Sequence, residues 1–131
     1  MSTEITIKKS DGLIETIDKN GLGNILKPLI QEIHLFDSYV AGTTFLEDQT
    51  VLEKIQVGDK LNLMREDNKF DENAILIFTE DKRKLGYVPE KDNIIFARLM
   101  DAGKMLSARI NDIELKGSFT KISIGIYLVD F

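Results

Sequence analysis

The feature of this sequence that most restricts its fold is a series of short strand patterns around one helix pattern. The clearest strand pattern lies near the end of the chain, where apolar and other residues alternate from Lys121 to Val129. A period of two is typical of a β-strand that buries one face. Five further segments are predicted as strands: Leu35–Val40, Lys60–Arg65, Ala74–Phe78, Lys84–Val88 and Leu106–Ile113.

The helix pattern follows Asp92. We expect the side chain of Asp92 to accept hydrogen bonds from the first free backbone N–H groups of the helix. Gly103 fits the left-handed position at which many helices end. An order of strands, one helix and further strands favours a small barrel or a sandwich over a parallel α/β sheet.

The first 32 residues carry weaker patterns. Two short strands are indicated at Ile5–Ile7 and Leu13–Ile17. A helical spacing of apolar residues then runs to Ile33 and is interrupted by Pro28, which marks a first helical turn or separates two short helices.

The length of 131 residues fits one domain, and no linker or repeat divides the chain. We therefore predict an N-terminal extension over residues 1–32 and a domain over residues 33–131.

The absence of cysteine excludes disulfide bonds and thiolate metal sites. No apolar run approaches the roughly 20 residues that span a bilayer, so we expect no membrane contact and a cytoplasmic location.

The formal net charge of −5 argues against bulk electrostatic binding of nucleic acid, which needs clustered Lys and Arg. The charge is uneven, however. Residues 1–80 carry 8 basic and 15 acidic side chains, whereas residues 81–121 carry 9 basic and 6 acidic ones. The later part of the chain can therefore present a basic surface that the total conceals.

Catalysis has little support in the residues present. His34 is the only histidine, and no carboxylate lies at a spacing from it that indicates a catalytic pair. No nucleophile elbow, zinc-protease motif or phosphate-cradling glycine loop occurs. We expect a protein that is not an enzyme and that uses no cofactor.

The segment Arg65–Ala74 is rich in oxygen-bearing side chains and invites comparison with a calcium loop. Phe70 interrupts the series of ligands and no glycine is present, so the segment does not fit an EF-hand, and we predict no metal site. A metal-dependent nuclease, which needs further carboxylates brought in by the fold, is the least favoured alternative. Two other interpretations remain from the residues alone. The segment is a polar loop between strands, or it stacks a nucleic-acid base on Phe70 while its polar groups bind the sugar.

Three blocks of this sequence resemble the HIRAN domain, in particular the small stand-alone bacterial HIRAN proteins. They are Val40–Phe45, then Gly58–Asp59 with Leu61–Ile75, and finally Lys84–Pro89 leading into the helix Asn93–Gly103. Their order and spacing agree over roughly residues 33–130. The resemblance implies a mainly β (α+β) fold: a small OB-like antiparallel β-barrel with two flanking helices.

The resemblance also implies a function. The best-understood HIRAN domains belong to helicase-like remodelling enzymes, where the domain holds the 3′ end of single-stranded DNA and recognises its free 3′-hydroxyl. We therefore expect a single-stranded DNA-binding module for that end, acting in DNA repair or replication restart. Its expected partners are the single-stranded DNA 3′ end and a helicase or other repair protein.

Matching residues carry the expected site. Asp71 corresponds to the family's acidic residue that accepts a hydrogen bond from the 3′-hydroxyl, and Phe70 to an aromatic that contacts the terminal nucleotide. Asn68 corresponds to a polar loop residue of the family that lies near the same nucleotide. The predicted DNA-binding residues are Phe45, Arg65, Asn68, Phe70, Asp71, Tyr87 and Lys91. For Arg65, a loop-bracing ion pair is the competing role, and for Phe45 and Tyr87 it is packing in the core.

The sequence departs from the DNA-binding members of the family after Gly42. Those members have a basic residue and further aromatics there, whereas this chain has Thr43–Leu46. Such a departure weakens phosphate contact more than it weakens the fold. The alternative function is therefore a protein-interaction adaptor that kept the barrel and lost DNA binding. If DNA binds, the acidic loop predicts weak binding with a shallow salt dependence.

Overall fold

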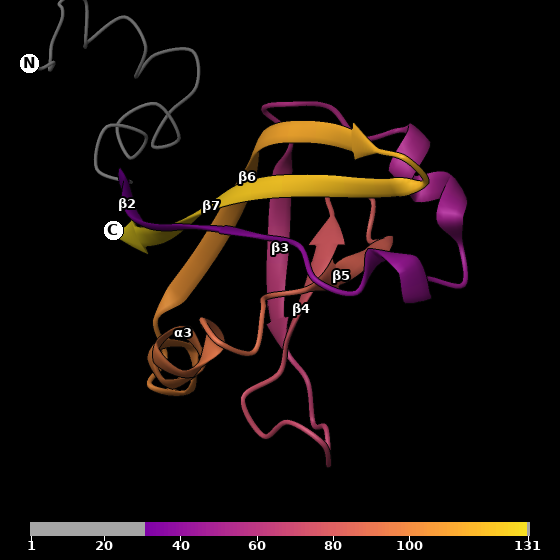
Figure 1. Cartoon of the computed structure of the whole chain (residues 1–131). Helices are drawn as coiled ribbons and strands as arrows, with labels where there is room; N and C mark the ends of the chain where they lie inside the picture. Colours follow the sequence, from indigo (N-terminus) through magenta and orange to yellow (C-terminus); the bar gives the residue numbers. More distant parts are fainter. Residues whose placement is uncertain (1–30, 131) are drawn as a thin grey trace, which may run out of the picture. The chain divides into compact units, whose positions relative to one another are not determined.

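The computed structural model describes residues 31–130, and residues Ile33–Val129 form one compact unit (Figure 1). The two strands and most of the helical spacing predicted before residue 31 lie outside the described residues. Ile33 itself lies in a strand, so the prediction that the helical spacing reaches Ile33 is wrong. Helical spacing over so few apolar residues does not separate a helix from a strand.

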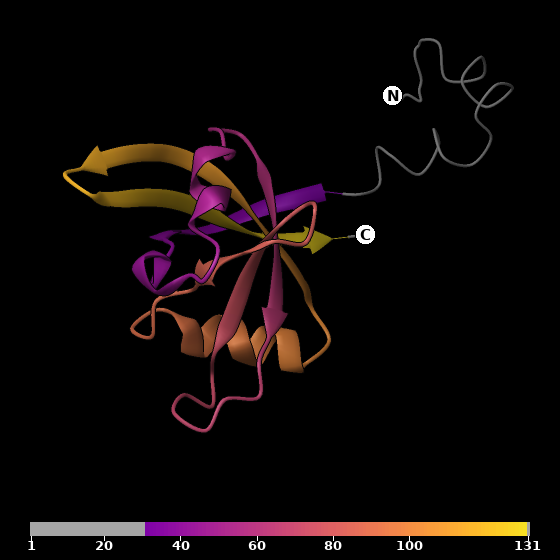
Figure 2. The ribbon, with the colours of Figure 1, turned by 90° about the vertical axis from the view of Figure 1, so that its right-hand side faces the viewer.

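Six strands form one antiparallel sheet. In chain order they are β2 (Gln31–Tyr39), β3 (Lys60–Arg65), β4 (Ile75–Thr79), β5 (Lys84–Tyr87), β6 (Met105–Lys116) and β7 (Phe119–Asp130). Their order across the sheet is β2-β7-β6-β3-β4-β5. The sheet is strongly curved, and β6 and β7 extend together beyond it as a long hairpin (Figure 2). The mainly β, OB-like architecture is thus a curved half-barrel.

The two ends of the strand order meet at one point. Ala41, just after β2, forms a bridge with Tyr87 of β5, in which each backbone N–H donates to the other residue's carbonyl at 2.8 and 2.9 Å. Gly86 makes this approach possible, because a Cβ atom at this position would lie 2.4 Å from the Ala41 carbonyl oxygen. The bridge therefore depends on a residue without a side chain.

The core fills the concave side of the sheet. Alternate residues of β7 point inward, and Ile122, Ile124 and Ile126 are fully buried, as the period of two predicts. Helix α3 (Asn93–Asp101) adds Phe96 and Ala97 to the same core. These residues make one continuous apolar cluster.

The described residues contain one α-helix, so the second flanking helix of the prediction is not confirmed. Two short 3₁₀ segments, η2 (Thr43–Phe45) and η3 (Gln49–Glu53), follow β2 instead. Helix α3 ends as predicted, with Gly103 at φ 92° and its N–H bonded to the Met100 carbonyl. Its start differs, because Asp92 makes no capping hydrogen bond and accepts one from Ser38 Oγ at 2.8 Å.

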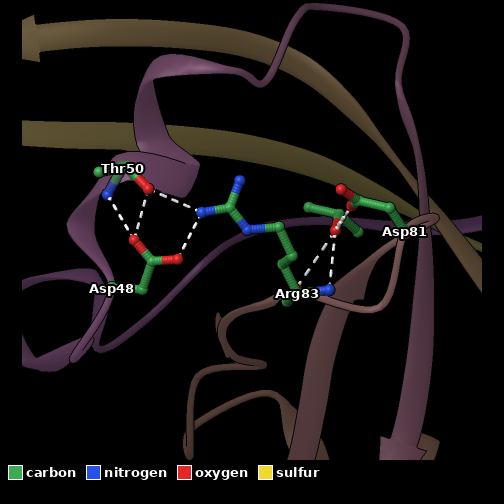
Figure 3. Close-up of polar contacts among 5 residues, drawn as sticks. Asp48, Thr50, Asp81 and Arg83 are labelled. Atoms are coloured by element: carbon green, nitrogen blue, oxygen red, sulfur yellow. Dashed lines mark hydrogen bonds and ion pairs between the residues drawn. The ribbon is translucent and has the colours of Figure 1, made fainter.

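An ion pair ties η3 to the turn between β4 and β5 (Figure 3). Arg83 Nη2 donates to Asp48 Oδ2 and, at 2.7 Å, to Thr50 Oγ1. Asp48 also accepts from the side chain and backbone of Thr50. The hydrogen bond from the Thr50 side chain, followed by that from Arg83, lowers the pKa of Asp48 to about 2. This contact holds the η2–η3 segment against the sheet.

Candidate nucleic-acid interface

Arg65 anchors the loop of residues 66–74 that joins β3 to β4. Its guanidinium donates to two loop carbonyls, from Nη1 to Ala74 at 2.6 Å and from Nη2 to Glu72 at 2.8 Å. Nε donates to Asp101 at the end of α3, at 2.9 Å. The hydrogen bond from Arg65 lowers the pKa of Asp101 below its usual value. Arg65 therefore braces the loop, one of the two roles expected of it, and its phosphate contact stays a prediction.

Asn68 shapes the tip of this loop. Its Oδ1 accepts from the backbone N–H of Phe70 at 2.8 Å, which closes a tight turn of the Asx type. Its Nδ2 donates to Glu66 Oε1 at 2.9 Å. The turn leaves the Phe70 ring 85% exposed, with the Lys69 ammonium 5.3 Å from the ring centroid. Phe70 therefore offers a free aromatic face and takes no part in the core.

Both carboxylate oxygens of Asp71, the residue after Phe70, accept hydrogen bonds. Oδ1 accepts from the backbone N–H of Asn73 at 2.9 Å, and Oδ2 accepts from Asn93 Nδ2 at 2.8 Å. Asn93 is the first residue of α3 and is fully buried. An ionised carboxylate has about four acceptor positions, so these two bonds fix its orientation and still leave room for another donor.

Tyr87 reaches the same loop from β5. Its hydroxyl lies 2.9 and 3.1 Å from the two carboxylate oxygens of Glu66, to which it donates. Lys84 Nζ lies 4.8 Å from the centroid of the Tyr87 ring. Because Glu66 also binds Asn68, a chain of hydrogen bonds connects the sheet to the loop tip. Glu66 was not predicted from the sequence.

Phe45 lies at the end of η2 and is 88% exposed. A Cβ atom at Gly42 would lie 3.8 Å from Cδ1 of Tyr87, so the start of this segment lies beside the Tyr87 ring. The core role considered for Phe45 is wrong, because its ring is almost entirely free. Phe45 and Phe70 are the most exposed large apolar residues in the described range.

Lys91 lies just before α3 and faces β2. Its ammonium is 5.5 Å from the centroid of the Tyr39 ring. The next two residues contact other elements: Asp92 bonds Ser38, and Asn93 bonds Asp71. The structure thus brings Arg65, Asn68, Phe70, Asp71 and Tyr87 together in and around one loop. Gly42, just before the segment that ends at Phe45, lies beside Tyr87, and Lys91 is connected to the loop through Asn93.

The described residues offer few groups for metal binding or catalysis. Among residues 31–130, no three His, Cys, Asp or Glu side chains gather closely enough to hold a metal ion. His34 does have a carboxylate partner, Asp37 Oδ1 at 2.7 Å, contrary to the expectation from spacing. No helix of the described part is long and apolar enough to cross a membrane.

Comparisons with known proteins agree with this architecture. The family model of the HIRAN domain matches residues 33–129. A crystal structure of a Lactobacillus plantarum protein is 26% identical with a TM-score of 0.72, covering 78% of this chain and 99% of that chain. The HIRAN domain of human HLTF is 15% identical with a TM-score of 0.62, covering 77% and 79%. No curated protein matches the chain. From residue 33 to residue 129, the chain belongs to the HIRAN domain family.

Proposed function

We propose that this protein is a non-catalytic module that binds the 3′-hydroxyl end of single-stranded DNA. The observation that carries the proposal is the loop 66–74, which places a fixed carboxylate, Asp71, next to the exposed ring of Phe70. In this proposal the terminal base stacks on Phe70, and Asp71 accepts a hydrogen bond from the 3′-hydroxyl. Tyr87, Asn68 and Arg65 hold the loop in place.

The chemistry of Asp71 gives the proposal its specificity. An ionised carboxylate only accepts hydrogen bonds, so it attracts a hydroxyl and repels a 3′-phosphate at the same position. Asn73 and Asn93 keep its two oxygens oriented, so little rotational freedom is lost when the hydroxyl arrives. Stacking of a base on an aromatic ring adds about 1–3 kcal/mol and tolerates any base.

Charge sets the strength of this binding. Glu66, Asp67, Asp71 and Glu72 surround the tip of the loop, so counterion release supplies little of the affinity. We expect weak binding whose dependence on salt is shallow. A steep dependence would mean that the strand lies on another, basic surface.

The test is a pair of short fluorescent oligonucleotides that differ only in a 3′-hydroxyl or a 3′-phosphate. Fluorescence anisotropy at low salt should show tighter binding of the hydroxyl end. Asp71→Asn should abolish this preference, since the repulsion of phosphate is lost. Asp67→Asn is the matched control, because it removes the same charge from an exposed residue of the same loop. Equal binding of the two ends, or none, would refute end recognition.

The adaptor function has one observation in its favour. Two large apolar side chains that share one face of β2, Ile33 and Leu35, are 42% and 37% exposed. A helicase or another repair protein is the partner class that the family resemblance suggests for such a surface. A protein recovered with this chain after nuclease treatment, and lost when Leu35→Ser is introduced, would support an adaptor role in repair or replication restart.

A further inference from the structure

A pocket of about 340 Å³ lies between β2, β7 and the residues that precede α3. Its polar lining includes Ser38, Tyr39, Lys91, Lys121, Ser123 and Asn111. None of these side chains belongs to the loop of residues 66–74. The pocket is therefore distinct from the loop.

Two lysines supply its free positive charge. Among the described residues, neither Lys91 nor Lys121 has a carboxylate within ion-pair distance. Glu114 stands opposite Lys121 in the β6–β7 register, but its carboxylate lies 3.8 Å from the ammonium of Lys116. The two ammonium groups are thus available to an anionic ligand.

The two carboxylates of the pocket are already engaged as acceptors. Asp37 accepts from His34 at 2.7 Å and from Asn111 at 3.3 Å, and Asp92 accepts from Ser38 at 2.8 Å. The formal charge of the lining is nevertheless balanced, two lysines against two aspartates. Such a pocket does not concentrate anions strongly by itself, so it suits a ligand that is already held nearby.

Three consecutive residues connect this pocket to the loop. Lys91 lies over Tyr39, Asp92 bonds Ser38, and Asn93 bonds Asp71. Consecutive Cα atoms are 3.8 Å apart, so the Cα atoms of Lys91 and Asn93 lie within about 8 Å of each other. Lys91 of the pocket therefore lies two residues from the side chain that orients Asp71, so the pocket and the loop are neighbouring sites.

We propose that this pocket binds the phosphodiester backbone of single-stranded DNA on the 5′ side of the terminal nucleotide. Lys91 and Lys121 are the phosphate ligands, and the ring of Tyr39 packs against the sugar or base between them. This inference rests on the proposed function, since the end held at Asp71 sets which part of the strand reaches the pocket. It adds Tyr39 and Lys121 to the interface.

The test compares Lys121→Gln with Lys54→Gln, a charge-matched control whose lysine lines a different cavity. Each variant is titrated with a dinucleotide and a hexanucleotide, both ending in a 3′-hydroxyl, over a range of salt concentrations. Lys121→Gln should weaken hexanucleotide binding by about threefold. It should also reduce the slope of log K against log salt by about 0.7, the value for one phosphate contact in a single strand.

The same experiment separates this inference from the proposed function. With Lys121→Gln the preference for a 3′-hydroxyl over a 3′-phosphate should be unchanged, and thermal melting should match that of the control. If the salt slope of Lys121→Gln equals that of Lys54→Gln, the pocket is not a phosphate site, even where end preference holds. If wild type shows no end preference but Lys121→Gln still lowers the slope, the pocket binds phosphate, but end recognition and the 5′ placement of the strand both fail.

Discussion

Gly86→Ala is the substitution whose effect follows most directly from the structure. The added methyl would lie 2.4 Å from the Ala41 carbonyl oxygen and 2.5 Å from Val40 Cγ1. These distances are far below van der Waals contact, so the segment after β2 has to move away from β5. That movement breaks the Ala41–Tyr87 bridge, which consists of two backbone hydrogen bonds.

The expected cost can be worked from these contacts. Two lost backbone hydrogen bonds cost about 1 kcal/mol each, and overpacking at a buried position costs about 1–3 kcal/mol. The sum of about 3–5 kcal/mol is a large part of the 5–15 kcal/mol typical of a whole domain. Because Tyr87 also holds Glu66, binding of DNA should weaken with the fold.

Urea unfolding followed by circular dichroism measures this free energy. Gly103→Ala is the control, since Gly103 has φ 92° and its added methyl would meet no neighbouring atom within 4 Å. Its cost comes from the left-handed backbone alone and should be about 1 kcal/mol. If Gly86→Ala loses no more stability than Gly103→Ala, the close approach at the bridge does not stabilise this fold.

Three further predictions concern single side chains. Phe70→Leu should weaken binding of a single strand by about 1–3 kcal/mol in anisotropy titrations. The melting temperature should be unchanged, because the ring is exposed. Phe70→Trp should keep the affinity, and an equal loss of affinity in the two variants would contradict stacking. Asn93→Ala should free the Asp71 carboxylate and so reduce the preference for a 3′-hydroxyl, measured as the ratio of the affinities for the two ends. An unchanged ratio would show that Asn93 does not orient Asp71 for end recognition. Folding lowers the pKa of Asp48, so its contribution to stability is present above about pH 4 and is lost as the pH falls toward about 2. In acid unfolding, the stability of wild type over Asp48→Asn should therefore disappear in this window. A difference in stability that stays constant with pH would contradict the assigned cause.

Much of the sheet could be predicted from the sequence, because a strand that buries one face has apolar residues at every second position. The inward residues Ile122, Ile124 and Ile126 are an example. The outer part of the β6–β7 hairpin carries no such pattern, since Leu115 and Phe119 there are exposed. The predicted strands at Leu106–Ile113 and Lys121–Val129 were therefore shorter than β6 and β7.

The candidate site was predictable only in part. The Asx turn at Asn68 and the exposed ring of Phe70 are local features, so their residue types and spacing carry the signal. The supporting contacts are not local: Asn93 meets Asp71 across 22 residues, and Arg65 meets Asp101 across 36. Such pairs are created by the fold, and a single sequence holds no pattern that points to them. The same reason explains the side chain of Asp92, which bonds Ser38 of a distant strand in preference to capping its own helix.

Competition between linear and circular single strands tests the central proposal most directly. A circular strand has the same bases and phosphates as a linear strand of equal length but has no 3′ end. We predict that unlabelled linear DNA displaces a fluorescent oligonucleotide with a 3′-hydroxyl from the protein, whereas the circle at equal nucleotide concentration does not. Equal displacement by the circle would show that the protein binds the strand along its length, and would contradict recognition of the 3′-hydroxyl by Asp71 and Phe70.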